Sequence, residues 1–136
     1  MIRLKNPFLP MSGYTAMTVW PFVFVRTDLA HRYTETTDRH ERIHARQQQE
    51  MLVAGSVIAA VLALCGLGWW SLLACPLFFW WYAAEWLLRA MWSTSNAWAY
   101  RNLAFEREAY ARQHDPGYLD RRRPFAWAGY LRCPKA

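Results

Sequence analysis

The chain has 136 residues, enough for one domain, and 54% of them are hydrophobic and 17% aromatic. Its net charge is +6, with seven of the 16 Lys and Arg residues in residues 1–50, eight in residues 93–136, and Arg89 between them. Because the basic residues flank an uncharged apolar centre, the pattern argues against a nucleic-acid-binding protein. It favours an integral membrane protein, in the inner membrane if the chain is bacterial, with its flanks on the cytoplasmic side.

Residues 1–33 are predicted to form an extended or β segment. Turn-forming Pro7 and Pro10 come first, and the stretch 14–25 is rich in β-branched and aromatic residues. Pro21 interrupts this stretch, which predicts an edge position in a sheet. An edge strand here could pair with the backbone of an extended peptide.

Residues 34–64 are predicted to form one helix, since they contain no Pro and only one Gly, Gly55. Asp38 followed by Glu41 resembles a capping arrangement at the start of this helix. Residues 39–50 are polar and residues 51–64 are almost wholly apolar. We therefore expect a polar helix that runs on into a first membrane helix.

A second membrane helix is predicted over residues 71–92, after a Gly66-Leu-Gly68 turn and a Trp69-Trp70 pair that would lie at the membrane interface. Each apolar run is close to the length that a membrane span needs. The two would form a transmembrane hairpin with both ends on one side. The alternative is an apolar core hairpin in a soluble protein. Cys65 and Cys75 are expected to be buried free thiols, and Glu85 is expected to pair with Arg89 one turn later.

A third helix is predicted over residues 95–114, with Ser95 among its cap candidates and Asp115-Pro116-Gly117 beyond its end. Residues 115–136 mix an Arg121–Arg123 run with aromatic residues. This mixture predicts an amphipathic tail that lies at a phospholipid interface. The expected fold is mainly α, with a short N-terminal β segment.

The sequence His40-Glu41-Arg42-Ile43-His44 is an H-E-x-x-H motif on the predicted helix. His40 and His44 lie one turn apart on one face, so both imidazoles can bind the same Zn²⁺ ion. Zinc lowers the pKa of a bound water molecule, and the Glu41 carboxylate could then accept its proton as a general base.

A catalytic zinc site needs a third protein ligand. The candidates lie in Phe105-Glu-Arg-Glu-Ala-Tyr110, where Glu106 and Glu108 point in nearly opposite directions around a helix. Glu106 shares its face with Leu103 and Ala109, whereas Glu108 lies among arginines and is expected to face solvent. We therefore predict Glu106 as the ligand, with Glu108 as the alternative.

These motifs resemble the gluzincin metallopeptidases, in which an H-E-x-x-H helix is followed by a helix carrying Glu-x-x-Ala. The resemblance covers the two motif helices and implies that Glu106 of Glu106-Arg-Glu-Ala109 is the third zinc ligand. This chain has Tyr110 where those families have Asp or Asn. It is also similar to short bacterial membrane proteins with His-Glu-x-x-His and Phe-Glu-x-Glu-Ala-Tyr motifs, which imply no activity.

Other polar residues could assist such a site. Gln47 and Gln48 could hold the ligands by hydrogen bonds, or form a polar collar at the membrane surface. Tyr110, Tyr100 or His114 could stabilise the oxyanion that forms on a substrate.

The sequence therefore predicts a zinc-dependent membrane metalloendopeptidase with a peptide or protein substrate. Two alternatives remain: a membrane scaffold or partner protein with an incidental motif, and a di-metal carboxylate oxidoreductase. The second is disfavoured because Glu41-x-x-His44 has no second Glu-x-x-His to complete a di-metal site.

Overall fold

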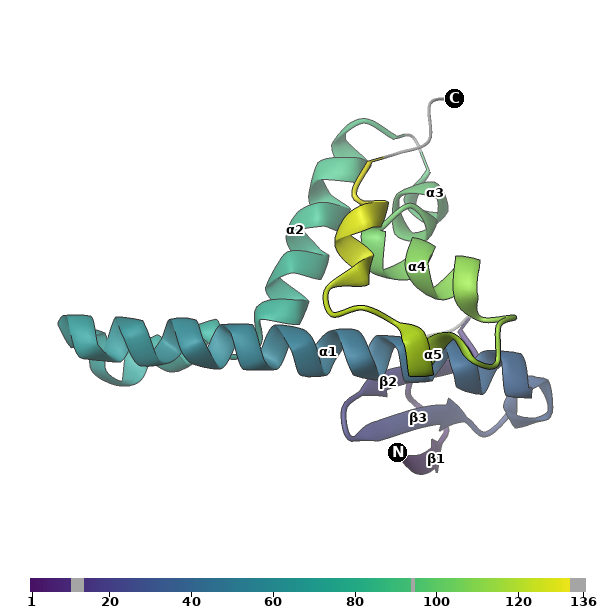
Figure 1. Ribbon diagram of the computed structural model, residues 1–136. Coiled ribbons are helices and arrows are strands. Elements are labelled where there is room, and N and C mark those ends of the chain that lie inside the picture. Colours follow the sequence, from purple (N-terminus) through teal and green to yellow (C-terminus); the bar gives the residue numbers. More distant parts are fainter. Residues whose placement is uncertain (11–13, 94, 133–136) are drawn as a thin grey trace.

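The computed structural model describes residues 1–10, 14–93 and 95–132 (Figure 1). Its N-terminal segment forms a three-stranded sheet of β1 (Ile2–Asn6), β2 (Ala16–Val19) and β3 (Phe22–Arg26) in the order β1-β3-β2. β3 pairs in parallel with β1 and antiparallel with β2. The predicted β segment is thus confirmed. Pro21 lies in the turn between β2 and β3, and only β2 of these two strands is at an edge.

The helix α1 (Glu35–Leu62) follows a short 3₁₀ turn, η1 (Ala30–Arg32), and carries the H-E-x-x-H motif. Thr34 caps it, because Thr34 and Thr37 exchange side-chain and backbone hydrogen bonds in a capping box. The predicted cap at Asp38 is therefore wrong. Asp38 instead pairs with two guanidinium groups, those of Arg3 and Arg42, each at 2.7 Å.

The apolar end of α1 projects from the body of the molecule and folds back on itself (Figure 1). A π-helical turn, η2 (Ala63–Leu67), and a 3₁₀ helix, η3 (Gly68–Ala74), form the tip and the return segment. Gly66 and Gly68 have φ of 93° and 53°, which makes the predicted turn possible. We call residues 51–74 the apolar arm. Cys65 lies exposed at its tip, so the expected burial of this thiol is wrong.

The helix α2 (Leu77–Met91) leaves α1 at a steep angle instead of running back along it (Figure 1). The predicted second membrane helix, 71–92, thus begins as the 3₁₀ helix η3, and its α-helical part has 15 residues. In the described part of the chain one helical stretch, Glu35–Ala74, is long and apolar enough to cross a membrane. A hairpin with two transmembrane helices remains a prediction.

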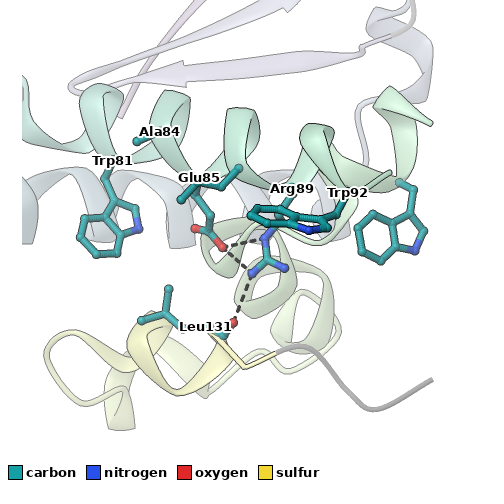
Figure 2. Close-up of a pocket in the computed structure, with 8 residues that line it drawn as sticks. Trp81, Ala84, Glu85, Arg89, Trp92 and Leu131 are labelled. Carbon is teal, nitrogen blue, oxygen red and sulfur yellow. Dashed lines mark hydrogen bonds and ion pairs between the residues drawn. The ribbon is translucent and has the colours of Figure 1, made fainter. Parts of the chain in front are cut away.

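The predicted third helix is broken into α3 (Asn96–Arg101), capped by Ser95, and α4 (Ala104–Arg112). The break occurs because the N-terminus of α4 is capped by another helix: Ala104 N–H donates to Glu85 Oε1 of α2 at 3.0 Å. Glu85 also pairs with Arg89 at 2.6 Å, as predicted, and Arg89 donates to the Leu131 carbonyl (Figure 2). This ion pair therefore joins α2, α4 and the C-terminal segment.

The C-terminal segment packs on the body, with a short helix α5 (Tyr118–Arg121) and a 3₁₀ helix η4 (Ala126–Tyr130). Trp127 is buried and joins the core cluster around Phe105. Arg122 is buried too, and it extends toward α1 and α4. The prediction of a tail lying at a lipid interface is wrong for these two residues, because the core and the buried acids of the body take them up.

Candidate metal centre

The two motif histidines and Glu106 meet where α1 packs against α4. His40 Nε2 and His44 Nε2 lie 3.0 Å apart. The Glu106 carboxylate lies across from both, with Oε2 3.5 Å from His40 Nε2 and Oε1 3.4 Å from His44 Nε2. All three side chains are buried. The structure thus brings together the three residues that the sequence predicts as metal ligands.

The arrangement fits a tetrahedral divalent ion. Two ligands bonded to zinc at tetrahedral angles lie about 3.3 Å apart, close to the separations found between these three groups. Glu106 Oε2 is buried and has no hydrogen-bond partner among the described residues. A buried carboxylate oxygen without a donor is costly unless a cation lies beside it. A His₂Glu donor set is one that zinc takes in catalytic sites.

Gln47 fixes the orientation of the His44 ring. Its Nε2 donates to the Phe105 carbonyl at 3.1 Å and to Glu108 Oε2 at 3.0 Å, and both groups can only accept. Its Oε1 therefore faces His44 Nδ1, at 2.8 Å. Because Oε1 is an acceptor, Nδ1 must carry the proton, and Nε2 is left free to bind a metal.

Gln113 supports His40 in the same way, and the sequence did not point to it. Its Oε1 lies 3.1 Å from His40 Nδ1, which leaves His40 Nε2 directed at Glu106. At position 110, where the resemblance implies Asp or Asn, the Tyr110 ring instead packs edge-on against His40 at 4.7 Å. His114 is exposed and contacts Gln113 rather than the cavity. The only sequence signal for Gln113 was helical periodicity, which puts it four residues after Ala109 on the face of α4 that meets α1.

Glu108 has a different role from either one predicted for it. It is 0% exposed, so the expectation that it faces solvent is wrong. It also points away from the histidines, since it accepts from Tyr118 Oη at 2.8 Å and pairs with Arg122. Arg122 reaches across to Glu50 of α1 as well, with Nη2 3.2 Å from Glu50 Oε2. This network neutralises Glu108 and holds it against Gln47.

Glu41 lines a cavity of about 320 Å³ together with the three candidate metal ligands, His40, His44 and Glu106. Glu41 is buried, and its Oε2 accepts a hydrogen bond from Thr18 Oγ1 of β2 at 2.7 Å. This hydrogen bond from Thr18 fixes the orientation of the carboxylate of Glu41, the predicted base. The two residues are 23 positions apart, so no local sequence pattern indicates the contact. The rest of the lining includes Tyr14, Phe78, Phe79, Tyr82 and Tyr100.

Gln48 joins α1 to the sheet instead of supporting a ligand. Its Nε2 donates to the Thr18 carbonyl at 2.7 Å, and its Oε1 accepts from Trp20 N–H at 2.7 Å. The side chain therefore covers the outer edge of β2 between these residues. Ala16 and Met17, which also line the cavity, come before the part of β2 that Gln48 covers.

The charges in the centre depend on one another. Burial alone would lower the pKa of His44, but the Glu106 carboxylate outweighs it and raises that pKa to about 9. Burial opposes the ionisation of Glu106, yet the two histidines hold its pKa well below the usual value. Burial and the nearby Glu106 raise the pKa of Tyr100, so its hydroxyl stays neutral and can donate a hydrogen bond.

No protein-family model matches this chain, and no curated protein or solved structure is significantly similar to it. The function must therefore be inferred from the site itself.

Proposed function

We propose that this protein is a zinc-dependent metallopeptidase bound to a membrane, with His40, His44 and Glu106 as the zinc ligands. The observation that carries the proposal is the convergence of two imidazole Nε2 atoms and one buried carboxylate within 3.5 Å of one another. Oε1 of this carboxylate accepts from Tyr82 Oη, and Oε2 has no hydrogen-bond partner among the described residues. Glu41, a second carboxylate, lines the same cavity and is not needed as a ligand. This combination of three ligands and a separate acid is typical of zinc hydrolases.

Zinc, when bound, supplies Lewis-acid activation of water and of a carbonyl group. Glu41 would accept a proton from the attacking water molecule and pass it to the amine that leaves when the C–N bond breaks. Thr18 keeps the Glu41 carboxylate turned toward the cavity. The neutral hydroxyl of Tyr100, which also lines the cavity, is placed to donate to the oxyanion of the substrate.

The substrate that suits the cavity is a polypeptide in an extended conformation. The Ala16–Thr18 segment of β2 lines the cavity and can offer backbone hydrogen bonds to such a chain. The aromatic residues Phe78 and Phe79 on the other wall favour an apolar substrate side chain. The apolar arm supports a location at a phospholipid bilayer, and the basic flanks favour its cytoplasmic side.

The first test is the metal content of the purified protein. We expect about one zinc per chain by elemental analysis, and loss of that zinc in His40→Ala, His44→Ala and Glu106→Ala. His31→Ala, which removes an exposed histidine, is the matched control and should keep its zinc. A metal-free protein, or zinc that survives the loss of His40 and His44, would overturn the proposal and leave a membrane scaffold with an incidental motif.

Glu108→Gln completes the series, because it separates the two candidate carboxylates. Since Glu108 points toward Arg122 and Gln47, this variant should still bind zinc, though more weakly. Complete loss of zinc in Glu108→Gln, with retention in Glu106→Ala, would reverse the assignment of the third ligand.

A further inference from the structure

The apolar arm carries on its surface the side chains that a soluble protein buries. The exposed fractions of Leu64 and Trp69 at its tip are 90% and 87%. The exposed apolar side chains of α1 within the arm spread over about 240° of the helix circumference. They are Leu52, Val53, Val57, Ile58 and Val61. A protein partner would cover one stripe of a helix, whereas a fluid apolar solvent covers it on all free sides.

Polar side-chain groups in and beside the return segment of the arm have backbone carbonyl partners, as groups inside a bilayer need. Ser71 Oγ donates to the Gly68 carbonyl at 2.8 Å, and Trp80 Nε1 donates to the Leu73 carbonyl at 2.8 Å. The return segment lies close against α1, because a Cβ on Gly55 would stand 2.3 Å from the Ala74 carbonyl oxygen. The arm is therefore a compact pair of segments without a charged residue.

A second exposed apolar surface lies on α2, at a steep angle to the arm (Figure 1). Trp80, Ala84, Leu87 and Met91 follow one another three or four residues apart and form its central stripe. The residues that flank this stripe are exposed as well, so the apolar face of α2 is broad: Phe79, Trp81, Leu88 and Trp92. The opposite face of α2 carries Phe78 and Glu85, which are buried, and α3, α4 and η4 lie on that side. The stripe therefore faces away from the body, toward the side where the arm projects.

We infer that this protein binds one face of a phospholipid bilayer through an L-shaped surface: the apolar arm enters the hydrocarbon, and α2 lies flat in the interface on its exposed stripe. An amphipathic helix in the membrane plane and an apolar segment at a steep angle to it match a flat interface above an apolar layer. α2 itself does not cross the membrane. The inference rests on the membrane association in the proposed function and not on the bound metal.

This placement fixes where the metal centre lies. His44 comes seven residues before Met51, about 10 Å along the axis of α1, so the centre would lie just outside the hydrocarbon. The aromatic wall of the cavity, Phe78 and Phe79, lies at the base of the arm, where α2 begins. The substrate class that follows is a polypeptide segment that emerges from, or lies on, the same bilayer surface.

The experiment measures the depth of single nitroxide labels in vesicles of phosphatidylethanolamine and phosphatidylglycerol, by the relative accessibility of oxygen and a nickel chelate. The natural Cys65 is labelled after Cys75→Ala and Cys133→Ala. Two further proteins, which also carry Cys65→Ala, are labelled at Ala84→Cys or at Met91→Cys, both on the α2 stripe. Zinc content is measured on the same samples.

We expect the label at Cys65 to lie deep in the hydrocarbon and the labels at positions 84 and 91 to lie at one common, shallow depth. If α2 crosses the membrane, position 84 should instead lie up to about 10 Å deeper than position 91, which overturns the inference. If every label contacts the nickel chelate, the apolar arm lies in water and the inference is wrong. If labels at Cys65 couple to each other, a second copy of the chain covers the arm instead of the bilayer. Zinc retained in those cases would leave the proposed metal site standing.

Discussion

The two halves of α1 reverse the usual relation between polarity and burial. In residues 35–50 the polar side chains of His40, Glu41, His44 and Gln47 are buried, whereas in residues 51–62 most apolar side chains are exposed. Burying polar groups is costly unless every one has a partner, so the first half indicates a preorganised site. Exposed apolar groups are costly in water, and their cost is removed in the bilayer that we propose for the second half.

The largest effect that would test the polar half is on activity. Replacing Glu41 with Gln removes the proton acceptor but keeps the size of the side chain and the contact with Thr18. We expect peptide hydrolysis to fall by about 10²- to 10⁴-fold, with zinc content unchanged. Glu35→Gln, an exposed acid on the same helix, is the control. Equal activity in Glu41→Gln would remove Glu41 from the chemistry.

The buried ion network should give the largest effect on stability. Arg122→Ala would leave the Glu50 and Glu108 carboxylates buried without their shared cation. Breaking a buried pair from one side costs about 3–5 kcal/mol, which denaturant unfolding of the protein in detergent can measure. The neighbouring Arg123 is exposed, and Arg123→Ala should change the unfolding free energy little.

A substitution at Gln47 tests whether the buried polar side chains of residues 35–50 increase the affinity for zinc. Gln47→Met keeps the volume but removes the hydrogen bond to His44 Nδ1, so we expect zinc affinity to fall by about 10- to 100-fold. Competition with a chelator measures this change. Gln49→Met, which alters a side chain bonded only to Arg46 among the described residues, should leave the affinity unchanged. Equal losses in both variants would mean that the effect is not specific to His44.

A smaller effect is expected in the apolar half. Gly55→Ala places a methyl group against the Ala74 carbonyl and forces the return segment away from α1. Overpacking of this kind lowers the unfolding free energy by about 1–3 kcal/mol. Zinc binding should be unchanged, because His40 and His44 lie three turns or more before Gly55 in α1. Gly129→Ala, where nothing lies near the added methyl group, is the control. Loss of zinc in Gly55→Ala would show that the two halves of α1 are coupled.

The sequence was sufficient for the features that depend on local patterns. The motif helix, the glycine turn and the Glu85–Arg89 pair follow from helical periodicity or short-range propensity. The meeting of His40 and His44 with Glu106 joins distant segments, and it was predicted from the helix face of Glu106 together with the resemblance to the Glu-x-x-Ala motif. The mainly helical class and the N-terminal strands follow from composition and alternation.

The features that failed depend on contacts between distant segments. Glu108 was expected to face solvent because it shares a helix face with arginines, but Arg122, 14 residues later, pairs with it in the interior. The break between α3 and α4 depends on Glu85, 19 residues before Ala104. Thr18 and Gln113, which fix Glu41 and His40, also come from other elements. Helical periodicity does not indicate which tertiary partner will neutralise a charge.

The contact between Arg122 and Glu108 also has a consequence for the order of synthesis. The His44 ring is oriented by Gln47, Gln47 donates to Glu108, and the cation that pairs with the buried Glu108 carboxylate is Arg122 of the C-terminal segment. A nascent chain that ends before residue 122 therefore has both motif histidines and Gln47, but Glu108 still lacks its buried cation. Residues 51–74 are translated well before that point, so the apolar arm is complete while the support of His44 is still unfinished.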